Sequence, residues 1–118
     1  MDREGVATFK APSADDPMLA EVVRRLVEAY RPERVYLFGS VARGEADPDS
    51  DYDLFVILPD ATPEHLRSED WGYRALRGTK TAADILVWTR TDFDRQLHLK
   101  ASLPSTVLRE GRLLYGAG

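Results

Sequence analysis

The stretch Leu37-Phe-Gly-Ser-Val-Ala-Arg-Gly-Glu-Ala-Asp-Pro-Asp-Ser-Asp-Tyr-Asp-Leu54 joins a Gly-Ser pair to an Asp-x-Asp pair, with ten residues between them. An apolar run precedes the stretch at residues 35–38, and another follows at residues 54–58. Short apolar runs bounded by polar and turn-forming residues are typical of buried strands. The sequence therefore predicts strands over 35–38 and 51–58, joined by a short helical segment over 40–44 and a polar loop over 45–50.

The rest of the chain adds helices and a third strand. Apolar residues recur at three- and four-residue spacing after Pro17, which predicts a helix that ends near Arg31-Pro32. The other expected elements are a helix over 62–78, a strand over 82–88, a helix over 91–99 and a short helix over 104–110. Because helices and strands interleave, we expect an α+β fold with a mixed β-sheet flanked by helices.

The length of 118 residues predicts one domain with a single core. Residues 1–13 are small, polar and weakly patterned, so we interpret them as a flexible N-terminal arm, followed by a single domain over 14–118.

The composition excludes several classes of function. Cysteine is absent, which rules out disulfides, thiolate zinc sites and a cysteine nucleophile. The net charge is −4 and no Lys/Arg-rich block occurs, so extended nucleic-acid binding is not expected. The chain shows neither a signal peptide nor a run of membrane-spanning length. We therefore expect a cytoplasmic protein without membrane contact.

The Asp-x-Asp pair carries the first part of the proposed chemistry. On a strand, Asp51 and Asp53 would point to the same face, with Cα atoms roughly 6.5–7 Å apart. Two such carboxylates can converge on Mg²⁺, which takes oxygen ligands from one or two carboxylates together with substrate phosphates and water. Standing alone, an Asp-x-Asp pair is more often a solvated strand start, but the preceding Gly-Ser pair favours a functional site.

Three further residues complete the pattern. Gly39 permits a sharp turn, and Ser40 with the following amides can donate hydrogen bonds to phosphate oxygens. Arg43, about one helical turn further on, can add a charge-assisted contact to the same phosphates. Asp84 lies within an otherwise apolar strand, where an unpaired charge would be costly. It therefore either lies at the sheet rim near a metal site or is paired by basic groups or amides.

Together, Gly39-Ser40-Val-Ala-Arg43-Gly44, Ser50-Asp51-Tyr-Asp53-Leu54 and Asp84 resemble the minimal nucleotidyltransferases of the DNA polymerase β superfamily. The ending Leu108-Arg-Glu-Gly-Arg-Leu-Leu-Tyr115 is also similar to these small proteins. The resemblance implies the polymerase β-like nucleotidyltransferase fold. It also implies a metal-dependent enzyme that uses ATP or another nucleoside triphosphate.

The resemblance assigns roles to individual residues. It implies that two Mg²⁺ ions are held by three catalytic aspartates: Asp51, Asp53 and Asp84. It further implies that the nucleotide phosphates are bound by Gly39, Ser40, Arg43 and Ser50.

The acceptor is left open by the motif, but small relatives of this type are often paired with a helical HEPN-type protein. Some act as antitoxins that transfer AMP to that partner, so we expect adenylylation of a hydroxyl on a partner toxin. One alternative is transfer to a small molecule such as an aminoglycoside, with a partner subunit or a homodimer completing the pocket. Another is a non-catalytic module that neutralises its partner by binding.

Overall fold

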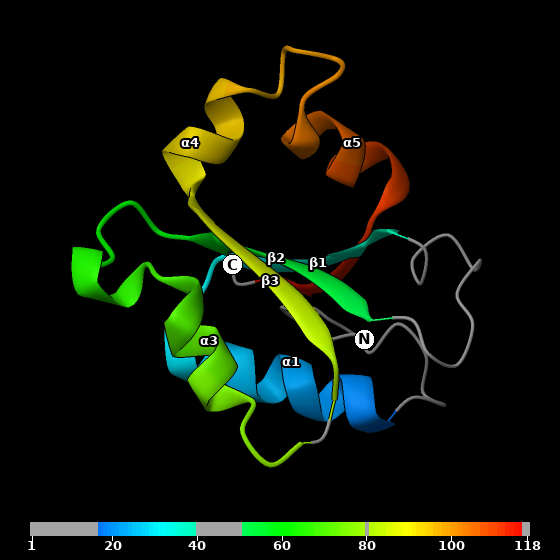
Figure 1. Cartoon of the computed structure of the whole chain (residues 1–118). Coiled ribbons are helices and arrows are strands. Elements are labelled where there is room, and N and C mark those ends of the chain that lie inside the picture. The colour runs from blue at the N-terminus through cyan, green and yellow to red at the C-terminus, as the bar shows by residue number, and fades with distance from the viewer. Residues whose placement is uncertain (1–16, 40–50, 80, 117–118) are drawn as a thin grey trace, which may run out of the picture.

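The structure is a computed structural model that describes residues 17–39, 51–79 and 81–116. In this part of the chain, four strands form one mixed sheet with helices on both faces (Figure 1). The strand order is β3-β2-β1-β4, and the strands are β1 (Arg34–Phe38), β2 (Tyr52–Leu58), β3 (Ala83–Thr89) and β4 (Arg112–Gly116). The α+β architecture expected from the sequence is thereby confirmed.

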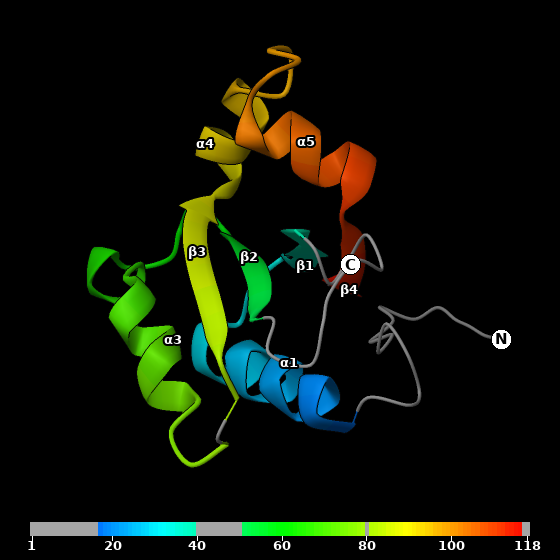
Figure 2. The same ribbon diagram turned by 45° about the vertical axis from the view of Figure 1, so that its right-hand side comes forward.

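The helices lie in two layers, one on each side of the sheet. Helices α1 (Pro17–Tyr30) and α3 (Glu69–Ala75) cover one face, and α4 (Arg90–Arg95) and α5 (Leu103–Glu110) lie over the other (Figure 2). A short 3-10 helix, η1 (Glu64–Leu66), precedes α3. Within the described residues, no helix is both long and apolar enough to cross a membrane.

Helix α1 forms where the apolar periodicity predicted it. Its buried residues fall at three- and four-residue spacing, which gives the helix one apolar face toward the sheet: Leu19, Val22, Val23, Leu26 and Tyr30. The helix ends at Tyr30, because Arg31 adopts a left-handed conformation with φ of 51° just before Pro32. The predicted end near Arg31-Pro32 is confirmed, and the helix is already formed at Pro17, the first described residue.

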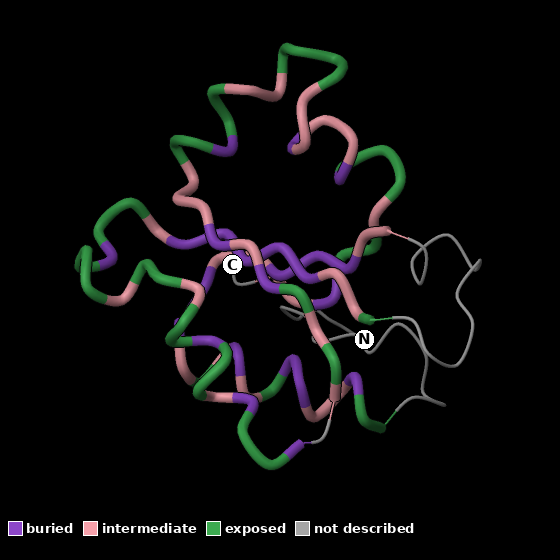
Figure 3. The backbone as a smooth tube through the Cα atoms, viewed as in Figure 1, coloured by how far each residue is buried: buried purple, intermediate pink, exposed green. Residues whose placement is uncertain are grey.

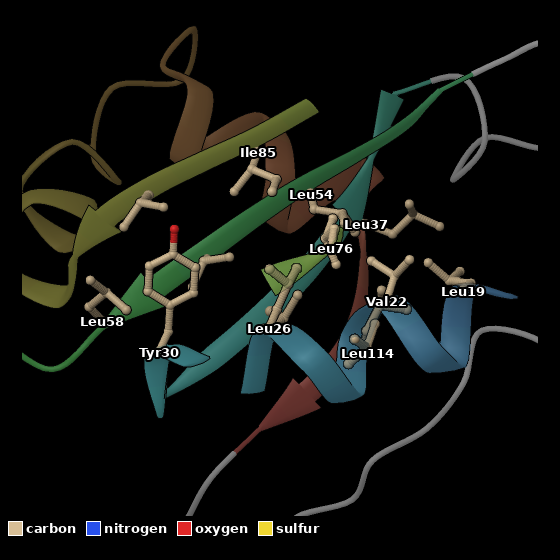
Figure 4. Close-up of a cluster of buried hydrophobic side chains, with 14 residues drawn as sticks. Leu19, Val22, Leu26, Tyr30, Leu37, Leu54, Leu58, Leu76, Ile85 and Leu114 are labelled. Carbon is tan, nitrogen blue, oxygen red and sulfur yellow. The ribbon is translucent and has the colours of Figure 1, made fainter. Parts of the chain in front are cut away.

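The larger core lies between the sheet and the α1–α3 layer. Leucine and valine side chains from β1 and β2 alternate into it, and Ile85 and Leu114 join them from the outer strands (Figure 4). Burial follows this layer closely, with the buried residues concentrated in the strands and on the inner side of α1 (Figure 3). This core fixes which residues of each strand point to the α1–α3 face and which point away.

A second, aromatic cluster lies on the α4–α5 face. Phe55 contacts Trp88 and Phe93 edge-on, with ring centroids 5.2 Å and 5.5 Å apart, and Tyr36 stacks on Phe93 at 6.1 Å. Val107 of α5 is also buried in this cluster. The sheet is therefore covered on both faces, and β2 is buried from Leu54 to Leu58.

One predicted helix is wrong in extent. The sequence favoured a continuous helix over 62–78, whereas the chain forms η1, breaks at Arg67-Ser68 and resumes as α3. The break is stabilised from α1, because the Tyr30 hydroxyl donates to the carbonyl of Ser68 at 2.6 Å and accepts from the Gly72 amide at 2.7 Å. Tertiary contacts thus override the local helical pattern.

Two further differences concern the second half of the chain. Helix α4 begins after Thr89, whose side chain accepts a hydrogen bond from the Asp92 amide, and it ends at Arg95 rather than near Leu99. Residues 112–116 form β4, to which no strand had been assigned. The predicted segments over 40–44 and 45–50 and the arm over 1–13 lie outside the described residues.

Candidate active site

Three aspartates lie where β2 and β3 begin. Asp51 is exposed and stands just before β2, Asp53 is half-buried within β2, and Asp84 is exposed as the second residue of β3. Because β2 and β3 run parallel, their first residues lie at the same end of the sheet. The three acidic residues are therefore brought to one end of the molecule.

The strand register places Asp53 beside Asp84. The two residues are Cα partners in the parallel ladder, and neighbouring strands lie about 4.8 Å apart. The next pair, Leu54 and Ile85, belongs to the core on the α1–α3 face. Since successive side chains point to opposite faces, both carboxylates point to the α4–α5 face. Asp84 thus points to the same side as Asp53, as a shared site requires.

Gly39 lies against the Asp53 carboxylate on the other side. Residue 39 follows directly on β1, and Phe38 at the end of β1 is the Cα partner of Asp53. Gly39 has φ of 77°, a left-handed conformation that favours glycine. A Cβ at this position would overlap Oδ2 of Asp53 and lie 3.1 Å from its Cγ. The turn therefore needs glycine for its conformation and for its close approach to the acid.

The base of the site is aromatic. Phe55, two residues after Asp53 on the same face, is fully buried, and its ring lies 6.2 Å from that of Phe38. This apolar support holds the strand ends that carry Gly39 and Asp53, and it leaves the carboxylates at the margin of the cluster.

Two residues of α3 that were not among the predicted site residues support the strand that carries Asp84. The Tyr73 hydroxyl accepts a hydrogen bond from the Ile85 amide at 3.0 Å, and Glu69 Oε2 accepts one from the Val87 amide at 3.2 Å. Glu69 and Tyr73 are four residues apart, so they share one side of the helix. The four-residue spacing of Glu69 and Tyr73 is visible in the sequence. It indicates that they support β3 only once β3 is known to be an edge strand.

The carboxylate oxygens of Asp51, Asp53 and Asp84 are suited to binding a hard cation. Carboxylate oxygens are the ligands that Mg²⁺ prefers, and the aspartates supply only these. Across the described ranges, however, no three acidic or histidine side chains are gathered closely enough to hold a metal ion. The fold itself aligns Asp53 with Asp84. Neighbouring carboxylates repel each other. They can therefore approach more closely only when a bound cation offsets their charge.

The remaining site residues from the sequence analysis, Ser40, Arg43 and Ser50, lie outside the described residues. The structure thus brings together Gly39, Asp53 and Asp84, and it places Asp51 next to them along the chain. Their roles in binding and catalysis stay predictions.

Comparison with protein families identifies the class. The model of the nucleotidyltransferase domain family matches residues 18–114. This match spans most of the chain, so the chain belongs to that family. Comparison with curated proteins finds no match.

Solved structures show the same fold. A toxin–antitoxin structure with AMP-PNP matches with a TM-score of 0.57 and 22% identity, over 82% of this chain and 72% of that one. A mutant of the toxin–antitoxin MntA-HpeT matches with a TM-score of 0.55 and 18% identity, also over 82% and 72%. A protein from Sulfolobus solfataricus, described as a nucleotidyltransferase, matches with a TM-score of 0.50 and 27% identity, over 67% and 70%. The polymerase β-like nucleotidyltransferase fold expected from the sequence is confirmed.

Proposed function

We propose that this chain is a Mg²⁺-dependent nucleotidyltransferase that transfers AMP from ATP to a hydroxyl group on a partner protein. One observation carries the proposal: Asp53 and Asp84 are in register on one face of the sheet, with Gly39 directly against Asp53. A paired set of acids beside a glycine turn is the arrangement that phosphoryl-type transfer needs, because such catalysis rests mainly on positioning and electrostatics.

Each residue has a role in this proposal. Asp51 and Asp53 hold Mg²⁺ and orient the nucleotide phosphates, while Asp84 completes the site for a second ion from the neighbouring strand. Gly39 lets the backbone approach the phosphates, and the residues proposed to bind them further along are Ser40, Arg43 and Ser50. When bound, Mg²⁺ neutralises charge on the phosphate and carboxylate oxygens.

The reaction is an in-line displacement at the α-phosphorus of ATP. The acceptor oxygen forms a new bond to this phosphorus, the bond to the β-phosphate oxygen breaks, and pyrophosphate leaves. Asp84 faces the acceptor side and takes the hydroxyl proton as the new bond forms. The exposure of Asp84 supports this role, since an acceptor on another protein has to reach it from outside.

The acceptor proposed is a hydroxyl on a helical HEPN-type toxin, which gives this chain the role of antitoxin. The similarity to toxin–antitoxin structures supports this choice, and one of those structures contains AMP-PNP. The exposure of Asp51 and Asp84 is compatible with a protein acceptor.

Intact-mass spectrometry tests the proposal. The chain is incubated with ATP, Mg²⁺ and the product of the neighbouring gene, and we expect the partner to gain the mass of one AMP group. Asp53→Asn should abolish the gain, whereas Asp92→Asn, at an exposed acid of α4, should leave it unchanged. A partner that never gains a nucleotide, or an active Asp53→Asn protein, would contradict the assignment.

The same variants separate catalysis from neutralisation by binding. If the protein in which Asp51, Asp53 and Asp84 are all replaced by Asn still neutralises its partner fully, the non-catalytic alternative is correct. Loss of neutralisation, together with retained complex formation, supports the enzymatic role.

A further inference from the structure

Gly111 stands at the corner between α5 and β4, where the chain turns back along β1 (Figure 2). Its φ of −84° and ψ of 178° are open to any residue, so the conformation does not require glycine. The surrounding space does. A Cβ at this position would lie 2.6 Å from the carbonyl oxygen of Val107 and 2.9 Å from that of Leu37. Both contacts are closer than van der Waals distance and involve backbone atoms, so the chain itself would have to move.

These two contacts join α5 and β4 to the end of β1. On the α5 side, the Gly111 amide donates a hydrogen bond to the Val107 carbonyl at 2.7 Å and closes the last turn of the helix. On the β1 side, Arg112, the next residue, is the Cα partner of Leu37. The absence of a side chain at residue 111 therefore lets the helix end and the strand start lie directly against the last residues of β1.

The end of β1 also carries one side of the candidate site. Phe38, which follows Leu37, is the Cα partner of Asp53. Gly39 comes next, and its backbone lies against the Asp53 carboxylate. Helix α5 supports the same segment through the fully buried side chain of Val107, which belongs to the aromatic cluster against which Phe38 packs. The Leu37 carbonyl is thus two residues away from the contact between Gly39 and Asp53.

We propose that Gly111 is a positioning residue for the candidate active site: it lets α5 and β4 hold the end of β1 where the contact between Gly39 and Asp53 needs it. This inference rests on the proposed function, because its effect on activity is an effect on nucleotidyl transfer. It assigns a role to the ending over residues 108–115, for which the resemblance implied none. Gly111 acts only through β1 and is not itself a catalytic residue.

Gly111→Ala tests the inference by steady-state kinetics. The added Cβ displaces the end of β1, and a shift of about 1 Å at a reacting group lowers the rate about 100-fold. We expect kcat/KM for ATP in transfer to the partner protein to fall by about that factor, mainly through a higher KM, because the Gly39 turn is proposed to bind the phosphates. The matched control is Gly116→Ala, the same change at the other end of β4, where a Cβ would meet only Leu113 Cδ2 at 3.5 Å. It should keep wild-type kinetics.

A pair of valines separates loss of positioning from loss of folding. Val107 and Val23 are both fully buried, on opposite faces of the sheet. Val107→Ala loosens α5 over the end of β1 and leaves Gly111 in place, so kcat/KM should fall about tenfold even if Gly111→Ala does not fold. Val23→Ala in α1 should lower the unfolding temperature by a similar amount, because both changes remove the same buried groups, and should keep the wild-type kcat/KM.

Nuclear magnetic resonance gives a readout that does not depend on activity. In isotope-labelled protein, the amide signals of Gly39 and Asp53 should shift in Gly111→Ala and keep their wild-type positions in Gly116→Ala. A wild type that transfers no nucleotide would contradict the proposed function and leave these signals to decide on the inference. The inference would be overturned by unshifted signals or wild-type kcat/KM in folded Gly111→Ala protein, and by wild-type kcat/KM in Val107→Ala.

Discussion

The carboxylate of Asp53 occupies the space that a side chain at position 39 would need. Position 39 therefore requires glycine for two reasons. Its left-handed φ of 77° favours glycine, and its backbone lies directly against the carboxylate of Asp53. The turn and the acidic strand cannot be altered independently. This relationship leads directly to a test that separates backbone strain from damage to the site.

We expect Gly39→Ala to lower nucleotidyl transfer by about 100-fold or more, because a displacement of about 1 Å at a reacting group costs about that much. The matched control is Gly78→Ala. Gly78 also has a left-handed φ, of 86°, but a Cβ there would meet no atom within 4 Å. Both variants should lose about 1–2 kcal/mol of stability, since a non-glycine residue in this conformation costs that much. Steady-state kinetics and thermal unfolding measure the two effects, and equal activity losses would contradict the role of the contact.

Asp84→Asn separates stability from activity at the acidic pair. Asp53 and Asp84 are adjacent like charges, so we expect the variant to unfold at a slightly higher temperature than the wild type in Mg²⁺-free buffer. Mg²⁺ should raise the unfolding temperature of the wild type, because a ligand that binds only the folded state stabilises it, and should have less effect on the variant. Differential scanning calorimetry with and without MgCl₂ measures both. An identical response of the two proteins to Mg²⁺ would count against a metal role for Asp84.

Tyr73→Phe tests the support that α3 gives to β3. The change removes the hydroxyl that accepts from the Ile85 amide, next to Asp84, and a hydrogen bond of this kind contributes about 1 kcal/mol. We expect kcat to fall while KM for ATP stays close to the wild-type value, because Asp84 acts on the acceptor side. Glu69→Gln is the control, since its amide oxygen can still accept from the Val87 amide. If the variant changes only the unfolding temperature and leaves kcat unaltered, Tyr73 has a structural role alone.

Tyr30 predicts a dependence of stability on alkaline pH. Burial raises the pKa of its hydroxyl from 10.0 to about 12. The folded protein therefore holds this proton more tightly than the unfolded chain does. The resulting stabilisation is fully present below the unfolded pKa of 10.0 and is lost as the pH rises to about 12. Urea unfolding across this range should show the loss in the wild type and a smaller slope in Tyr30→Phe.

The same Tyr30→Phe protein should be less stable than the wild type at pH 7 as well. Its hydroxyl links α1 to the Ser68 carbonyl and the Gly72 amide, and an unsatisfied buried group costs about 1–3 kcal/mol. Equal stability of the two proteins at neutral pH would show that this link contributes nothing.

The features that the sequence predicted well are those that depend on neighbours along the chain. Helix α1 follows from the apolar spacing between Leu19 and Tyr30, and three strands follow from short apolar runs, each within one residue of its observed start and end. The features that it missed depend on distant contacts. The break before α3 is stabilised by Tyr30, and β4 exists because it pairs with β1, which lies far away in sequence.

For the candidate site, too, the residues could be predicted from the local sequence, whereas their placement relative to one another could not. The motif identifies Gly39, Asp51, Asp53 and Asp84 as residue types suited to phosphate and metal chemistry. The pairing of Asp53 with Asp84 could not be derived from it, because the register of two parallel strands is set by the core residues between them and α1. The contact between Gly39 and Asp53 likewise needs the antiparallel register of β1 and β2.

The pairing of Arg34 with Gly116 has a consequence for how the chain matures on the ribosome. Strands β1, β2 and β3 are synthesised first, and the side of β1 that β4 later covers stays bare until residue 116 has emerged from the exit tunnel. Leu114, which is fully buried in the finished protein, reaches its place at the same late moment. Until β4 has formed, the sheet is incomplete and β1 presents an unpaired strand edge.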